Sequence, residues 1–217
     1  MRAVVLAIGA AALALCSRAE TAPMFRVDFS NPGLAPAQWT LEFHPDGKGH
    51  FHSQRGSAGS EGVHSLEAPD IDRDIRVSPR FAEHAFQVTQ RHKLFAKGCE
   101  SHLKVAFQGV KKLSYTGPDG EGGCEYNYSK DPEIQSLGDS LIAVATTIIE
   151  GARLEMLLQH DRLGLDREID VVCEALGDGR VQQISSIRDI LERLAEDTAV
   201  MERVRKRARD LLAKAND

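Results

Sequence analysis

The spacing of the apolar residues changes near residue 130, and this change constrains the fold more than any other feature of the sequence. Before it, as in FRVDF at 25–29, apolar and polar residues alternate, which is the period of a β-strand with one buried face. After it, over 132–159, apolar residues recur every three or four positions, which is the period of an α-helix. The sequence therefore predicts an α+β fold: antiparallel strands with a helix between two strand groups, a long covering helix, and a C-terminal all-helical segment.

The first strand group is predicted to contain a hairpin over residues 38–54. QWTLEF and HFHSQ alternate on either side of Asp46-Gly47, and an Asp-Gly pair is a strong turn signal. A helix is then expected to begin at Ser78-Pro79, because serine caps a helix N-terminus and proline suits the first helical position. It is expected to end near Lys97, just before a glycine.

Residues 98–128 are predicted to form a three-stranded meander. Alternating apolar residues indicate one strand over 103–107 and a second around 113–115, and Cys124 opens the third. One face of such a sheet is apolar and must be covered by another layer. The expected cover is the long helix over 132–159, and Asp131-Pro132 marks its start as a second pair of N-cap and first-turn residues.

From residue 160 onward the apolar pattern is helical throughout. Helices are expected between Asp166 and Gly177, over 185–197, and from Asp197 or Thr198 toward the end of the chain. We therefore expect an α+β domain over 20–159 and a helical segment over 160–217, which either forms a separate unit or packs on the same core.

The first 19 residues have the pattern of a cleaved signal peptide. Arg2 is followed by an uncharged, mostly apolar run over 3–16, shorter than the about 20 residues of a membrane-spanning helix, and then by small residues. Cleavage is expected after Ala19. The alternative is a lipoprotein signal acylated at Cys16, but Leu15 is larger than the residue that normally precedes a lipidated cysteine. We expect an exported protein, periplasmic or extracellular, with no transmembrane segment after cleavage.

Export makes a structural disulfide the expected use of two nearby cysteines. Cys99 and Cys124 fall at the same end of the predicted meander, so we expect a bond between them, with Cys99 folding inward over the end of the sheet. The sequence has no CxxC redox motif, and no further ligands at metal-site spacing accompany the pair. Cys173 lies in the amphipathic pattern IDVVCEAL, where a buried thiol behaves as a small hydrophobic residue.

Three histidines of the hairpin are candidate metal ligands. His50 and His52 point to the same face of one strand, and His44 shares the polar face of the partner strand. Three imidazoles suit zinc or copper, but an exposed hairpin tip lacks the supporting hydrogen bonds that such sites need. A solvated polar face is the simpler interpretation, and no cofactor is expected.

The sequence carries none of the common catalytic motifs. GxSxG, HExxH, a phosphate-binding loop and GxGxxG are all missing from it, and a net charge of −5 disfavours nucleic-acid binding. We expect a non-catalytic interaction or envelope-associated module, with an unknown protein or envelope partner, rather than an enzyme. The alternatives are a metal-binding protein or metalloenzyme that uses His44, His50 and His52, and a hydrolase with an unrecognised site.

Overall fold

The computed structural model describes residues 22–54 and 70–215. The predicted signal peptide over 1–19, with Cys16, lies outside the described residues. Within them, no helix combines the length and the apolar character that crossing a membrane requires.

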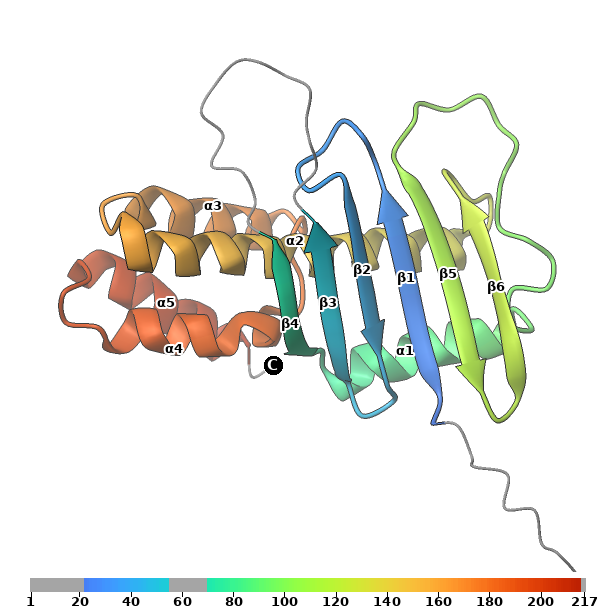
Figure 1. The fold of residues 1–217 in the computed structure, drawn as a ribbon, viewed down its shortest axis with the longest axis horizontal. Helices are drawn as coiled ribbons and strands as arrows, with labels where there is room; N and C mark the ends of the chain where they lie inside the picture. Colours follow the sequence, from blue (N-terminus) through green and yellow to red (C-terminus); the bar gives the residue numbers. More distant parts are fainter. Residues whose placement is uncertain (1–21, 55–69, 216–217) are drawn as a thin grey trace, which may run out of the picture.

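The strands form one antiparallel sheet in the order β4-β3-β2-β1-β5-β6 (Figure 1). The first strand of the chain lies inside this sheet, because β1 pairs with β2 on one side and with β5 on the other. The predicted hairpin is confirmed as β2 and β3. The bounds are β1 Met24–Ser30, β2 Gln38–Phe43, β3 Lys48–Gln54, β4 Ile71–Arg76, β5 Val110–Gly117 and β6 Gly120–Tyr126.

Helices follow both strand groups, which confirms the predicted α+β fold class. α1 and α2 cover one face of the sheet, and α3 to α5 lie beyond β4, next to the C-terminal part of α2 (Figure 1). Ser78 and Asp131 cap α1 and α2 as predicted, each accepting backbone N–H bonds of the first turn. The bounds are α1 Pro79–Arg91, α2 Pro132–His160, α3 Leu165–Gly177, the 3-10 helix η1 Ile184–Ile187, α4 Arg188–Glu196 and α5 Glu202–Lys214.

α2 contributes to two hydrophobic cores. Leu137 and Ile148 belong to the core that α1 and α2 form with the sheet, whereas Leu154 and Leu157 belong to the core shared with α3 to α5. A Cβ atom at Gly151 would lie 2.3 Å from Ile187 Cγ2, so this glycine lets η1 approach the helix closely. The predicted boundary at residue 160 therefore falls at the end of α2, a helix whose residues contribute to both cores.

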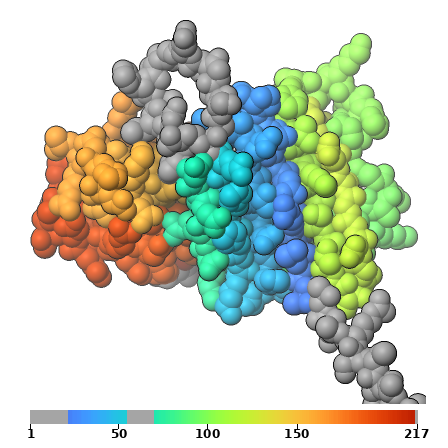
Figure 2. Space-filling model, viewed as in Figure 1, coloured from blue at the N-terminus to red at the C-terminus, as the bar shows by residue number. Residues whose placement is uncertain are grey.

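The predicted strand over 103–107 is wrong. Residues 99–109, which we call the arm, have no regular secondary structure and run along the edge of the sheet beyond β6 (Figure 1). The arm protrudes at this edge of the molecule in Figure 2. Residues 102–108 are all exposed, so the alternation of apolar and polar residues here corresponds neither to a buried face nor to a partner strand. The second strand group is therefore a two-stranded hairpin, β5 and β6.

The predicted disulfide between Cys99 and Cys124 is confirmed, with the two Cα atoms 5.7 Å apart. Its expected position is wrong, because Cys124 lies inside β6, opposite Leu113 of β5, and does not open a third strand. The bond joins the start of the arm to the edge strand. No intervening strand separates the two cysteines, so the expected inward fold over the sheet end is unnecessary.

Several helix boundaries differ from the prediction, and the helix expected over 185–197 is divided into η1 and α4. α1 ends at Arg91 because Lys93, Leu94 and Phe95 have positive φ angles, which an α-helix does not allow. Phe95 is buried, so packing of this turn against the core offsets its backbone cost. The last helix begins at Glu202, later than the predicted Asp197 or Thr198, after a turn in which the Val200 N–H donates to the Asp197 carbonyl.

Candidate binding site on the open face of the sheet

The sheet face opposite α1 and α2 is polar, and no described helix covers it (Figure 1). Because side chains alternate along each strand, the burial of Phe25, Val27 and Phe29 places Arg26 and Asp28 on this open face. The strand register then aligns one polar side chain from each of the six strands. This central row is, from β4 to β6, Asp72, His52, Thr40, Asp28, Lys112 and Glu125.

The middle of the central row is held by hydrogen bonds to Asp28. Thr40 Oγ1 donates to Asp28 Oδ1 at 2.8 Å, and Arg26 Nη2 donates to the same oxygen at 2.7 Å. Burial by itself raises the pKa of the Asp28 carboxyl, but the bonds from Arg26 and Thr40 outweigh it and lower the pKa. Asp28 is therefore an ionised, fixed acceptor at neutral pH.

A chain of His and Asp side chains forms the β3–β4 side of the open face. His50 Nδ1 lies 3.0 Å from Asp74 Oδ1, and His50 Nε2 lies 3.0 Å from Asp72 Oδ1. His52 Nδ1 lies 3.1 Å from the other oxygen of Asp72. The bond with Asp74 raises the pKa of His50 more than burial lowers it, and the charges of Asp72 and Asp74 add to the rise.

The structure brings two of the three candidate metal ligands together. His50 and His52 share the open face, but His44 lies at the hairpin turn, where its Nδ1 is 2.8 Å from the Pro23 carbonyl oxygen. Among residues 22–54 and 70–215, no group of three or more His, Cys, Asp or Glu side chains is arranged to hold a metal ion. His50 and His52 instead contact the carboxylates of Asp72 and Asp74. These residues belong to β4, and the sequence of the hairpin alone does not show that β4 pairs with it.

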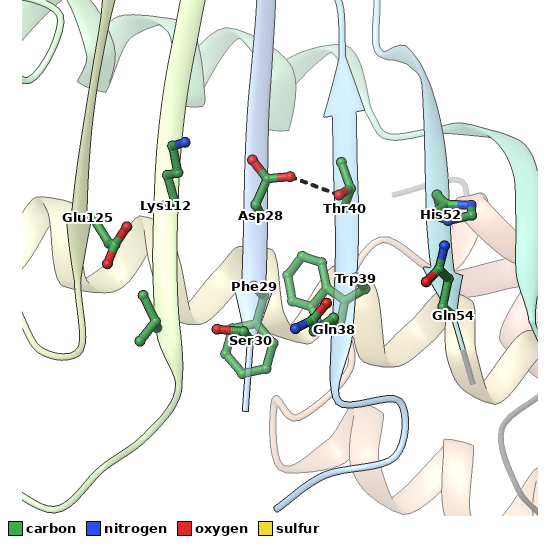
Figure 3. Close-up of a pocket in the computed structure, with 11 residues that line it drawn as sticks. Asp28, Phe29, Ser30, Gln38, Trp39, Thr40, His52, Gln54, Lys112 and Glu125 are labelled. Atoms are coloured by element: carbon green, nitrogen blue, oxygen red, sulfur yellow. Dashed lines mark hydrogen bonds between the residues drawn. The ribbon is translucent and has the colours of Figure 1, made fainter. Parts of the chain in front are cut away.

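A hollow of about 450 Å³ opens over the central row and the end of β1 and β2 (Figure 3). Uncharged polar side chains line one end of it, and Asp28, Lys112 and Glu125 line the other. Within the described residues, no side-chain hydrogen bond is formed by Ser30, Gln38 or Gln54 of this lining. The lining residues are Asp28, Phe29, Ser30, Gln38, Trp39, Thr40, His52, Gln54, Val110, Lys112 and Glu125.

Cys173, the remaining cysteine of the described chain, is not part of this site. It is half-buried in α3 and packs against the second core. Burial raises the pKa of its thiol, so the nucleophilic thiolate is disfavoured. This arrangement agrees with a thiol that serves as a small hydrophobic side chain.

No protein-family model matches the chain, and no curated protein sequence matches it either. The chemistry of the open face is therefore the basis for a functional proposal.

Proposed function

We propose that this protein is an exported, non-catalytic binding module whose open sheet face holds a polar, uncharged, hydroxyl-rich ligand. The observation that carries the proposal is the hollow itself, in which Ser30, Gln38 and Gln54 make no side-chain hydrogen bond to another described residue. A volume of about 450 Å³ is within the usual range of ligand sites. The residues that line the hollow belong to paired strands, which hold side chains more precisely than loops do.

The charges of the lining favour a ligand without net charge. Asp28 and Glu125 are acidic, while Lys112 and His52 are basic, so the hollow has no large excess of either sign. Carboxylates accept hydrogen bonds, lysine donates them, and the amides of Gln38 and Gln54 do both. A hydroxyl group also donates and accepts, so a polyol or carbohydrate would satisfy this mixed lining.

Binding is favoured over catalysis by the direction of one hydrogen bond. Thr40 supplies the hydroxyl of the central row, and it donates to Asp28 instead of to His52. A nucleophilic hydroxyl needs a base that accepts its proton and is itself held by a third group. His52 is held by Asp72, but Thr40 is not bonded to His52.

Export is supported by the Cys99–Cys124 disulfide, since such bonds persist in oxidising compartments. The apolar run over residues 3–16 agrees with a periplasmic or extracellular destination.

The binding proposal is tested with a panel of polyols, monosaccharides and oligosaccharides, screened by thermal shift and confirmed by calorimetry. For a ligand that binds, Gln38→Ala and Glu125→Gln are each expected to weaken affinity about tenfold, the effect of losing one or two hydrogen bonds. Thr116→Ala is the matched control, because Thr116 lies on the same open face outside the hollow. A panel with no binder, or equal losses in the hollow and control variants, contradicts the proposal.

A further inference from the structure

The arm is fixed firmly at both ends although it has no regular secondary structure. The disulfide joins the start of the arm to β6. Hydrogen bonds to the connection between β6 and α2 fix residues near both ends of the arm. These bonds run from the Ser101 N–H to the Tyr128 carbonyl at 2.9 Å, from the Gln108 N–H to Asn127 Oδ1 at 2.7 Å, and from the Asn127 N–H to Glu100 Oε2 at 2.7 Å. The middle of the arm is thus presented at a defined place.

That middle part exposes apolar side chains. Leu103, Val105 and Phe107 are 50%, 39% and 56% exposed, and they are three of the five exposed large hydrophobic residues among the described residues. Single exposed apolar residues are ordinary, but three of them within five positions of a segment that protrudes (Figure 2) indicate contact with another surface. None of the three packs into either hydrophobic core.

The arm and the turn before it are basic, in contrast to the chain as a whole. Lys93, Lys97 and Lys104 are exposed, and none of them forms an ion pair with a described residue. Glu100 is the acidic residue of this segment, and its carboxylate accepts the backbone N–H groups of Asn127 and His102. The bond from Asn127 is the main cause that lowers the pKa of Glu100. The segment therefore carries positive charge on a chain of net charge −5.

We propose that the arm is a docking site for a membrane surface rich in anionic lipid. Exposed apolar side chains and lysines on one segment are the combination that holds a peripheral segment at a lipid interface, with the apolar side chains in the acyl boundary and the lysines at the phosphates. Three side chains on a convex segment fall far short of the roughly 800 Å² that each partner buries in a standard protein interface. A deformable lipid surface can accommodate such a protrusion without a complementary groove.

Vesicle flotation tests this proposal on the full chain after removal of any signal peptide. The protein is expected to float with vesicles of phosphatidylglycerol and phosphatidylcholine, and to bind phosphatidylcholine alone at least about tenfold more weakly, with binding to the anionic vesicles falling as salt is raised. The double variant Leu103→Ser with Phe107→Ser is expected to lose at least about tenfold in binding. Leu163→Ser is the matched control, because Leu163 is 80% exposed and lies between α2 and α3, far along the chain from the arm.

A fluorescent reporter gives a second readout that does not depend on loss of binding. Trp39 is the sole tryptophan of the chain and is buried, so Phe107→Trp adds a probe at the arm against a constant background. A blue shift on addition of anionic vesicles supports insertion. Absence of vesicle binding by the unmodified protein, an equal loss in Leu163→Ser, or a dimer that the double variant abolishes would each overturn the lipid proposal.

Discussion

A pair of carboxyl groups between α2 and α3 predicts an unusual dependence of stability on pH. Glu150 of α2 is buried and accepts a hydrogen bond from Arg153 Nη1 at 2.8 Å. Its second oxygen and Glu168 Oε1 of α3 are buried and lack a donor while both groups are ionised. A proton on Glu168 supplies that donor. Burial first, and then the bond and the charge of Glu150, raise the pKa of Glu168 from 4.5 to about 7.

The magnitude follows from this rise in pKa. At 1.36 kcal/mol for each pH unit, ionising Glu168 in the folded protein costs about 3 kcal/mol. We expect about 2 kcal/mol, because the side chain is half-buried and water screens part of the effect. Since the folded pKa is raised, the stabilisation is complete below pH 4.5 and is lost as the pH rises through 7. Glu168→Gln cannot ionise and still offers an N–H donor to Glu150.

Urea denaturation of the full chain at pH 5 and pH 8.5 measures the effect. Glu168→Gln is expected to leave the free energy of unfolding nearly unchanged at pH 5 and to raise it by about 2 kcal/mol at pH 8.5. Glu174→Gln on the exposed side of the same helix is the control, and no pH-dependent gain is expected from it. An equal change at both pH values, or no gain at pH 8.5, would refute the shared-proton interpretation.

Three further predictions test other parts of the structure. Cys99→Ala is expected to lower the free energy of unfolding by roughly 3 kcal/mol, from the size of the loop that the disulfide closes, while the circular dichroism spectrum stays that of a folded protein. An unchanged melting temperature would contradict a stabilising role of the disulfide. Gly151→Ala is expected to destabilise by about 1 to 3 kcal/mol in urea, despite the higher helix propensity of alanine, because its Cβ would collide with Ile187. Gly177→Ala, where nothing lies within 4 Å of the added Cβ, is its control and is expected to be neutral or stabilising; similar losses at both glycines would remove the steric explanation. N-terminal sequencing of protein recovered from the envelope or the medium is expected to begin at Glu20, and a mature chain that retains the apolar run would exclude cleavage after Ala19.

Local patterns in the sequence were sufficient to predict many of the elements. Alternation together with Asp46-Gly47 predicted the hairpin of β2 and β3, and the caps at Ser78 and Asp131 predicted where α1 and α2 begin. These features depend on neighbouring residues, so they can be read without the rest of the chain. Alternation also predicts which face of a strand is buried. The sequence therefore predicts that His50 lies on the polar face of its strand.

The central row of the open face could not be predicted in the same way. Asp28 faces Lys112 because β1 pairs with β5, a strand that is more than 80 positions away in the sequence. No local pattern specifies that pairing, and a shift of one residue would reverse every side chain of the strand. The strand predicted in the arm is wrong for a related reason, since the alternation around Leu103 and Phe107 has the pattern of a strand whether or not another strand pairs with it.

The continuity of α2 has a geometrical consequence for the whole molecule. Each residue of an α-helix turns the chain by about 100°, and α2 carries both cores on one unbroken run of 29 residues. The orientation of the helical bundle relative to the sheet is therefore set by the phase of a single helix. One residue inserted after Ala152 would rotate the bundle about the helix axis by about 100° and separate Arg73 of β4 from Asp189 of α4, which now lie 2.7 Å apart. A substitution in α2, including the destabilising Gly151→Ala, leaves the phase of the helix unchanged, whereas a change in its length would require the two halves to pack in a new orientation.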